Sequence, residues 1–226
     1  HNIITIMGDN IVDLHSHILF GIDDGARNLE ESVEMARLWL EQGVKTVVAS
    51  PHFDVQKDNL EEFLIKRDKN HRILMESLKE NNIDLDVLFS AELYFRADLS
   101  RYDLSPFLIQ GTDYLLIELP TRTVPSRIKS TFEDLIYQGY NPVLVHIERY
   151  PSLKQDLNLF YELAAMGVLF QVNAETIING TDSFIDACFK KNYIHLIASD
   201  AHRFDSRKPN IKEALELIPE AHYYNG

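Results

Sequence analysis

The sequence predicts a single α/β domain built on a parallel β-sheet. Seven short apolar runs, rich in Val, Ile and Leu, are spread along the 226 residues. Their lack of alternation is typical of parallel strands that are covered on both faces. Amphipathic segments lie between them, and no linker interrupts the order of strand and helix. A chain of this length can bury one sizeable core.

Each predicted strand is bounded by polar or turn-forming residues. In chain order the strands are Ile11–Leu14, Val44–Ala49, Leu85–Phe89, Tyr114–Leu119, Pro142–Val145, Val168–Val172 and Ile194–Ala198. A closed barrel and an open doubly wound sheet both accommodate this order. No G-x-G-x-x-G follows the first strand, which argues against a nucleotide-binding open sheet.

Two helices carry clear start signals. Asn28 is followed three residues later by an acid and predicts a helix that stops at Gly43. Asn59 is followed by Glu62 in the same way and predicts a longer helix from Leu60 to about Asn81. Apolar spacing predicts the other helices at Ser126–Gln138, Lys154–Ala165, Ser183–Lys191 and Asn210–Leu217.

Composition excludes several classes of partner. Lys and Arg number 22 against 35 Asp and Glu, which gives a formal net charge of −13 at pH 7. General nucleic-acid or anionic-membrane binding is not expected, because such surfaces are held by clustered Lys and Arg. No run approaches the roughly 18 apolar residues of a membrane span. With a single cysteine and no signal peptide, the expected location is cytoplasmic.

The two ends of the chain are set apart from the domain. A leading His before Met7 suggests that residues 1–10 are an added leader or a disordered N-terminus, with the native start at or after Met7. We expect a single domain over residues 11–219 and a C-terminal tail over 220–226.

Potential metal ligands recur where the predicted strands end. In a parallel barrel these ends meet on one face, which is where such folds place their active sites. The residues concerned are His15, His17, Asp23, Asp24, His52, Glu92, Glu118, His146, Glu148, Glu175, Asp200 and His202. This repeated placement is stronger evidence for a site than any one motif.

The spacing within the motifs supports a shared metal site. The period of two in a strand points His15 and His17 to one side, where both can hold the same cation. Glu92 and Glu118 follow neighbouring strands, and each carboxylate can bridge two ions. A His, Asp and Glu set without thiolates suits Mn²⁺, Zn²⁺ or Fe²⁺. So many ligands imply two or more ions, as in centres that hydrolyse phosphoesters.

Arginine gives a second indication of phosphate chemistry. Arg149 follows the fifth strand and Arg207 lies five residues after His202. Both are expected over the metal face, where guanidinium groups either bind phosphate oxygens or form surface ion pairs. His195 is expected to be structural and His71 to lie on a solvated helix face. Cys188 is expected to fill the core; no Arg follows it in a C-x₅-R loop, which excludes a cysteine phosphatase.

Together, the motifs resemble those of the polymerase-and-histidinol-phosphatase (PHP) superfamily. The matching segments are Asp13–His17, Gly21–Gly25, Ser50–His52, Ala91–Glu92, His146–Tyr150 and Ser199–His202. More narrowly, the sequence resembles the bacterial manganese-dependent protein-tyrosine phosphatases found with capsule and exopolysaccharide genes. The similarity runs from about Ile11 to Pro219, and Ile147 stands where many relatives have Pro.

The resemblance implies a distorted seven-stranded parallel β/α barrel with a centre of three Mn²⁺ ions; Fe, Zn, Mg or Co are left open. The ligands it implies are His15, His17, Asp24, His52, Glu92, Glu118, His146, Asp200 and His202. It also implies that Arg149 and Arg207 bind phosphate and act in catalysis. We expect water activated by the cations to attack phosphorus in line with the tyrosyl oxygen. Asp200 or His52, if not occupied as a ligand, is a candidate to protonate the leaving group.

The implied substrate is the phosphotyrosine tail of a membrane-anchored bacterial tyrosine kinase that regulates polysaccharide production. Two alternatives remain open. Hydrolysis of histidinol phosphate or of a 3′-nucleotide would use the same centre with a different rim. A metal-binding scaffold would keep the site without turnover. An oligomer is also left open.

Overall fold

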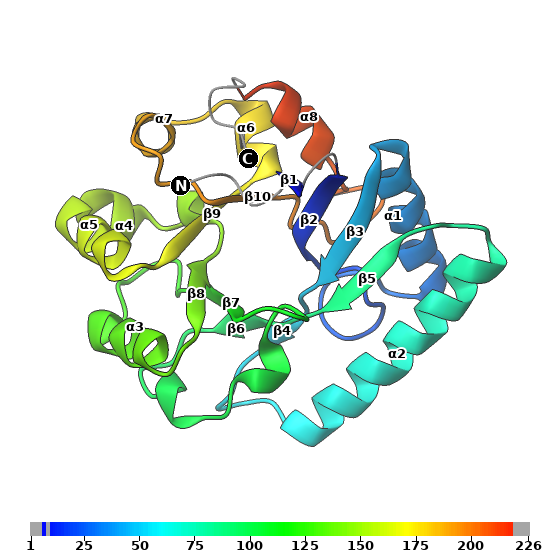
Figure 1. Ribbon diagram of the computed structural model, residues 1–226, viewed down its shortest axis with the longest axis horizontal. Helices are drawn as coiled ribbons and strands as arrows, with labels where there is room; N and C mark the ends of the chain where they lie inside the picture. The colour runs from blue at the N-terminus through cyan, green and yellow to red at the C-terminus, as the bar shows by residue number, and fades with distance from the viewer. Residues whose placement is uncertain (1–5, 8–9, 219–226) are drawn as a thin grey trace.

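The computed structural model describes residues 6–7 and 10–218 and consists of strands surrounded by helices (Figure 1). The strands are β1 (Ile6–Met7), β2 (Asn10–Ser16), β3 (Val44–Ala49), β4 (His52–Phe53), β5 (Asp86–Phe89), β6 (Glu92–Tyr94), β7 (Tyr114–Glu118), β8 (Asn141–Leu144), β9 (Leu169–Asn173) and β10 (Leu196–Ala198). The α-helices are α1 (Leu29–Glu41), α2 (Leu60–Glu80), α3 (Ile128–Tyr137), α4 (Pro151–Gln155), α5 (Leu157–Met166), α6 (Ala174–Asn179), α7 (Ser183–Lys190) and α8 (Ile211–Glu216). Three 3₁₀ helices are η1 (Leu99–Arg101), η2 (Ser105–Phe107) and η3 (Ile147–Arg149).

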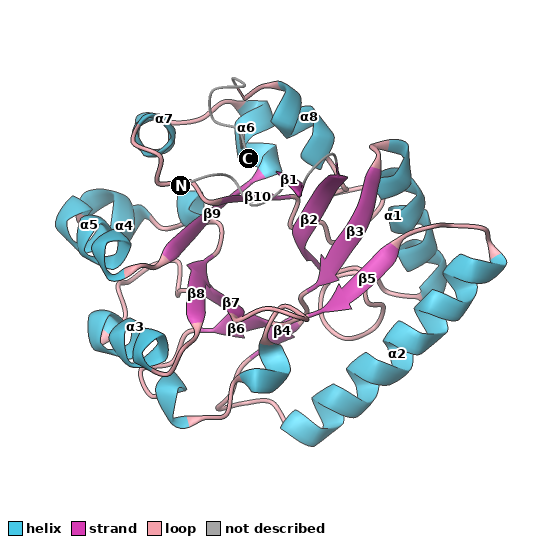
Figure 2. Cartoon of the chain, viewed as in Figure 1, coloured by secondary structure: helices cyan, strands magenta, loops and turns pink. Residues whose placement is uncertain are grey.

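The strands form two sheets, ordered β1-β2-β3-β5 and β10-β9-β8-β7-β6-β4. Apart from the antiparallel pair of β1 and β2, the paired strands are parallel. The sheets meet where Ser16 forms a parallel bridge with Ala201 and the Asp200 N–H donates to the carbonyl of His15 at 3.0 Å. The strands therefore curl round a common axis, with the helices outside (Figure 2).

The α/β class with parallel strands is confirmed, but the predicted count of seven strands is not. Each predicted strand matches an observed one, yet ten strands lie in the described part of the chain. Two of the additional strands, β4 and β6, follow β3 and β5 after short breaks. Pro51 has no N–H with which to continue the ladder of β3. Before β6, the Ala91 N–H leaves the ladder with β3 and donates to the carbonyl of Phe107 at 3.3 Å.

The helices follow the predicted caps, with one correction. Asn28 and Asn59 accept hydrogen bonds from the third residue after them, as predicted. The segment predicted as one helix at 154–165 is instead two. Pro151 begins α4, and the Asp156 side chain caps α5 by accepting from the Leu159 N–H at 3.1 Å. Helix α6 and the 3₁₀ helices were not predicted.

Two apolar clusters pack on opposite faces of the curled sheet. The larger joins the strands to helix residues such as Trp39 and Phe132. The smaller contains Val12, Leu116 and Val143 and has no helix residue among its buried members. In β7, Leu116 belongs to the smaller cluster while its neighbours belong to the larger, as strand alternation requires. The smaller cluster therefore fills the inner side of the curled sheet.

The ends of the chain fall only partly within the described residues. Ile6 and Met7, in the segment predicted as leader or disordered, form β1 against β2. Residues 1–5, 8–9 and the predicted tail 220–226 lie outside the described residues, so the division into domain and ends stays a prediction. Within the described chain, no helix combines the length and apolarity of a membrane span.

Candidate metal centre and phosphate-binding face

The side chains predicted as ligands meet at the C-terminal ends of the parallel strands. His15 is the next-to-last residue of β2 and Glu118 ends β7, while His52 and Glu92 begin β4 and β6, the short strands that follow the C-terminal ends of β3 and β5. His146 follows β8, and Asp200 and His202 follow β10. Their convergence comes from the parallel topology, because every parallel strand delivers its C-terminal residue to the same side of the sheet.

A β-bulge aims His15 into the centre. Asp13 pairs with Val47 and Ser16 with Ala49, so Leu14 and His15 both lie opposite Val48. The extra residue lets Leu14 contribute to the inner apolar cluster while His15 still reaches the site. The rings of His15 and His17 then lie 5.4 Å apart, on one side as predicted.

Glu92 is the buried hub of the cluster. Its Oε2 lies 3.1 Å from His15 Nε2, 3.3 Å from His17 Nε2 and 3.2 Å from His52 Nδ1. Its Oε1 lies 2.7 Å from His146 Nε2. The Glu92 side chain is only 1% exposed. Four imidazoles around one dry carboxylate make a set of donors suited to divalent transition metals.

The remaining ligand candidates lie on the solvent side of this hub. Asp24 Oδ1 is 3.4 Å from both His52 Nε2 and His202 Nε2. Glu118 Oε1 is 3.6 Å from His52 Nδ1. The side chains of Asp24 and His52 are 64% and 37% exposed, so they mark the mouth of the site.

Three overlapping groups of ligand atoms emerge, each with its atoms within 4.8 Å of one another. The groups are His17, Asp24, His52 and His202; His15, His17, Glu92 and Asp200; and His52, Glu92 and Glu118. His146 is in none of them but contacts Glu92 and, at 3.8 Å, Glu118.

Buried side-chain atoms that have no hydrogen-bond partner indicate whether the cluster suits a metal ion. The buried atoms without a hydrogen-bond partner in the described residues include His17 Nε2, His52 Nδ1, Asp200 Oδ1 and His202 Nε2. Buried polar atoms are normally paired, because an unpaired one costs free energy. All four belong to the groups above. The donors present therefore fit divalent cations.

The two central glutamates differ in charge. Burial, followed by repulsion from Glu92, raises the pKa of Glu118 to about 8. Burial also opposes ionisation of Glu92, but His15 and the other imidazoles hold the pKa of Glu92 well below its ordinary value. Burial lowers the pKa of His202 to about 3, and the neighbouring His17 adds to this effect. The centre therefore keeps one glutamate ionised, one protonated and at least one imidazole neutral near pH 7.

Asp200 joins the metal cluster to the two predicted phosphate-binding arginines. Its Oδ2 accepts from Arg149 Nη2 and from Arg207 Nη2, each at 2.8 Å. Its Oδ1 instead faces His15 and His17, at 3.5 and 3.3 Å. The two arginine side chains are 37% and 38% exposed, and each guanidinium group has further N–H groups for another anion.

Three of the six non-glycine residues with a positive φ in the described chain lie at this site. His146, Asp200 and Arg207 have φ angles of 37°, 51° and 47°, in the left-handed region that side-chain-bearing residues rarely adopt. Such residues cost free energy and are concentrated at functional sites. Here the strained residues are two ligand candidates and one phosphate-binding candidate.

Of the histidines predicted to lie outside the site, one prediction is confirmed and one is wrong. His195 is buried, and its Nδ1 accepts from the Phe170 N–H at 3.1 Å, as a structural role requires. His71 is half-buried and packs against β5 rather than lying on a fully solvated face. Its Nε2 lies 2.7 Å from the carbonyl of Val87, and its ring centroid is 4.2 Å from that of Phe89. Helix α2 packs this polar side chain against β5, which helical periodicity alone did not reveal.

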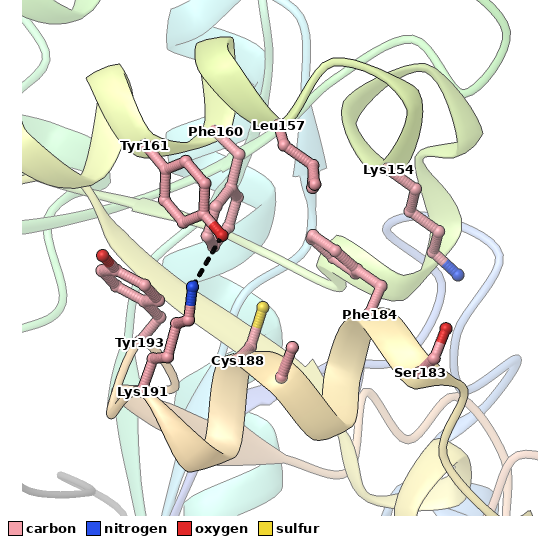
Figure 3. A pocket seen from close by; sticks show the side chains of 10 residues that line it. Lys154, Leu157, Phe160, Tyr161, Ser183, Phe184, Cys188, Lys191 and Tyr193 are labelled. Atoms are coloured by element: carbon pink, nitrogen blue, oxygen red, sulfur yellow. Dashed lines mark hydrogen bonds between the residues drawn. The ribbon is translucent and has the colours of Figure 1, made fainter.

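Cys188 is buried, as predicted, and is remote from the ligands. It lines a cavity of about 220 Å³ with residues of α5 and α7, including Phe160 and Phe184 (Figure 3). Burial raises the pKa of the Cys188 thiol to about 12. A protonated thiol is a poor nucleophile, which agrees with the exclusion of cysteine-phosphatase chemistry.

Several residues in contact with the ligands had another predicted role or none. Asp23 was predicted among the potential ligands, but its Oδ2 accepts from His17 Nδ1 at 2.7 Å, so it orients an imidazole while Asp24 faces the cluster. Tyr150 Oη lies 3.1 Å from His146 Nδ1. Gln171 and Asn173 contact His15 and Asp200. The sequence signal for Gln171 and Asn173 was that these two polar residues lie two positions apart at the end of a predicted strand.

Comparison with known proteins agrees with this geometry. The sequence model of the family described as "Capsular polysaccharide synthesis, CpsB/CapC" matches residues 11–224. Tyrosine-protein phosphatase CpsB of Streptococcus agalactiae serotype III is 32% identical over 220 residues, which cover 92% of this chain and 89% of that protein. Tyrosine-protein phosphatase YwqE of Bacillus subtilis is 32% identical over 216 residues, which cover 92% and 84%.

Solved structures of related proteins also resemble this chain. A chain from the crystal structures of YwqE from Bacillus subtilis and CpsB from Streptococcus pneumoniae, described as metal-dependent tyrosine phosphatases, superposes with a TM-score of 0.83. It is 31% identical and is matched over 94% of this chain and 87% of its own length. A mutant organophosphorus hydrolase from Deinococcus radiodurans, 14% identical with a TM-score of 0.51, shares the fold alone; the match covers 93% of this chain and 88% of that one. The chain belongs to the CpsB/CapC family of capsular polysaccharide synthesis proteins.

Proposed function

We propose that this protein is a metal-dependent protein-tyrosine phosphatase of the cytoplasm. Its substrate is the phosphotyrosine tail of a bacterial tyrosine kinase, and its activity regulates capsule or exopolysaccharide synthesis. The observation that carries the proposal is the buried set of imidazole and carboxylate atoms, four without hydrogen-bond partners, beside two partly exposed arginines. The relatives named tyrosine-protein phosphatases support phosphotyrosine as the substrate.

The centre is proposed to hold three divalent cations, one in each group of ligand atoms, with Mn²⁺ as the preferred ion. Ligands shared between groups, such as Glu92 and His17, suit such a cluster because they bring neighbouring ions close together. The proposed ligands are His15, His17, Asp24, His52, Glu92, Glu118, His146, Asp200 and His202. When bound, the cations supply positive charge for the phosphoryl oxygens and lower the pKa of the attacking water.

Arg149 and Arg207 are proposed to bind the phosphoryl group. Both guanidinium groups are fixed by one oxygen of Asp200, at 2.8 Å, and so are already oriented before substrate arrives. Their remaining N–H groups can donate to phosphoryl oxygens, where charge must be stabilised during phosphoryl transfer. A preorganised donor of this kind contributes about 10²–10³-fold to the rate.

Asp200 is better suited to hold these arginines than to protonate the leaving group. Its Oδ2 already accepts from Asn173, Arg149 and Arg207. Burial opposes ionisation of Asp200, but His15 and His17 hold the pKa of this carboxyl well below its ordinary value. A tyrosyl leaving group with a pKa of about 10 needs little protonation. His52, at the mouth of the site, remains the candidate for any proton that is donated.

Substrate selectivity and metal dependence can be tested in one experiment. Protein stripped with EDTA is assayed with a phosphotyrosine peptide, histidinol phosphate and a 3′-phosphorylated nucleotide, with and without added Mn²⁺. Fe²⁺, Zn²⁺, Mg²⁺ and Co²⁺ are compared at matched concentration. We expect release from the peptide alone, restored by Mn²⁺. Release only from another substrate would refute the proposed specificity, and binding of metal without release from any substrate would favour an inactive scaffold.

A further inference from the structure

We propose that Gln171 and Asn173 are positioning residues that present one nitrogen of His15 and one oxygen of Asp200 to the metal centre. The inference uses the proposed function only in treating the cluster as a metal centre. Both residues lie on β9 two positions apart, so their side chains point to the same face. Both are buried, at 0% and 4% exposure.

Their amide groups form one continuous hydrogen-bonded chain. Gln171 Oε1 lies 3.2 Å from the backbone nitrogen of His146 and 3.1 Å from His15 Nδ1. Gln171 Nε2 donates to Asn173 Oδ1 at 2.7 Å. Asn173 Nδ2 then donates to Asp200 Oδ2 at 2.8 Å. Two side chains thus connect three of the proposed ligands.

The direction of this chain is fixed at both ends. A backbone N–H only donates, so the Gln171 atom beside His146 must be the carbonyl oxygen. At the other end, Asp200 Oδ2 also accepts from Arg149 and Arg207, so the Asn173 atom that it faces must be the donor. Neither amide can flip without placing two donors or two acceptors against each other.

This direction sets the tautomer of His15. Because Gln171 Oε1 carries no proton, the N–H of the hydrogen bond must be on His15 Nδ1. Without a metal, His15 Nε2 shares a second proton with Glu92; once that proton is lost, the lone pair is on Nε2. That atom lies 3.1 Å from Glu92 Oε2 and 3.5 Å from Asp200 Oδ1, inside one group of ligand atoms.

The same chain leaves one particular oxygen of Asp200 available. Oδ2 is occupied by Asn173 and the two arginines, whereas Oδ1 is buried and has no hydrogen-bond partner in the described residues. Asp200 is therefore oriented to ligate through Oδ1. Partners of this kind behind metal ligands typically change metal affinity by 10–100-fold when they are removed.

The test compares Gln171→Leu and Asn173→Leu with the wild-type protein. In metal-free protein, at a pH high enough for His15 to be neutral, ¹⁵N NMR of labelled histidine reports which nitrogen of His15 carries the proton. Calorimetric titration with Mn²⁺ alone reports affinity. We expect Gln171→Leu to lose the exclusive Nδ1–H form and to bind Mn²⁺ 10–100-fold more weakly. Asn173→Leu should keep that form of His15 yet also bind Mn²⁺ more weakly, because it releases Asp200.

Thr131→Val is the matched control. Thr131 is buried, and its Oγ1 donates to the carbonyl of Ala97 at 3.0 Å, in a hydrogen bond that involves none of the proposed ligands. This variant should lose stability without changing the His15 tautomer or Mn²⁺ affinity. If Gln171→Leu does not fold, Gln171→Met replaces it. The unbranched methionine has neither the oxygen that faces His15 nor the amide donor for Asn173, so Mn²⁺ binding should still weaken.

The proposal is overturned if a folded Gln171 variant and Asn173→Leu both bind Mn²⁺ within twofold of wild type. It is equally overturned if Gln171→Leu keeps the wild-type tautomer of His15. Neither measurement uses a phosphoester. A wild-type protein that binds Mn²⁺ but hydrolyses no phosphotyrosine would therefore refute the proposed activity and leave the positioning roles intact.

Discussion

Glu118 should make the stability of the metal-free protein depend on pH, and Glu118→Gln should remove that dependence. Burial and repulsion from Glu92 raise the pKa of Glu118 from 4.5 to about 8 in the folded protein. The folded state then holds this proton more tightly than the unfolded chain. The contribution of this proton to the free energy of unfolding is fully present below pH 4.5 and is lost as the pH rises through 8. At about 1.4 kcal/mol for each pKa unit, this loss amounts to about 3 kcal/mol between pH 6 and pH 9.

Urea unfolding of EDTA-treated protein measures this effect directly. The stability difference between wild type and Glu118→Gln should shift by about 3 kcal/mol in favour of the variant between pH 6 and pH 9. For a chain of this size the corresponding change in relative Tm is about 6–12 °C. Glu133→Gln, an exposed change on α3, serves as the control. A difference that stays constant across this pH range would refute the reasoning about Glu118.

Three further predictions address the centre and the fold. Asp200→Ala should abolish turnover, because it removes a ligand and releases both arginines, while circular dichroism stays unchanged; retained activity would contradict the metal assignment. Arg149→Ala should lower kcat/KM by about 10²–10³-fold, and unaltered kinetics would remove Arg149 from the site. Trp39→Phe should cost about 1–3 kcal/mol in urea unfolding, because Trp39 Nε1 donates to the buried Asp13 at 2.8 Å; an equal midpoint and slope would show that this bond is not stabilising.

The proposed ligands could be found from the sequence because their placement follows a local rule. All but Asp24, which lies in the loop after the first strand, come at or just after a strand-like run of apolar residues, and the parallel topology brings them together. His15 and His17 show how far the rule extends. Alternation predicted that they share a side, and they do, but the bulge opposite Val48 determines how His15 reaches the centre. The sequence shows no signal for that extra residue.

Residues that act through another side chain are harder to predict. Asp23 and Asp24 are adjacent and chemically identical, yet Asp23 accepts from His17 Nδ1 while Asp24 faces His52 and His202. Only the path of the loop separates their roles. Gln171 similarly acquires its partners from the position of β9 beside β8 and β10, which pairing in space decides. From the sequence alone, Gln171 can be predicted only to be a polar residue in a strand.

The balance of charge in the site explains why an acidic protein can act on a phosphate dianion only with cations. The fixed positive charges closest to the cluster are Arg149 and Arg207, and both donate to the ionised Asp200. Glu92 is held ionised as well, and burial keeps His202 neutral near pH 7. Without cations, a phosphoryl group would meet two guanidinium groups already shared with a carboxylate. The buried carboxylates would then be offset by protons on His15 and His17, whose pKa values they raise against the effect of burial. The same carboxylates are the ligands that attract divalent ions, so cation binding adds positive charge to the face on which substrate must bind.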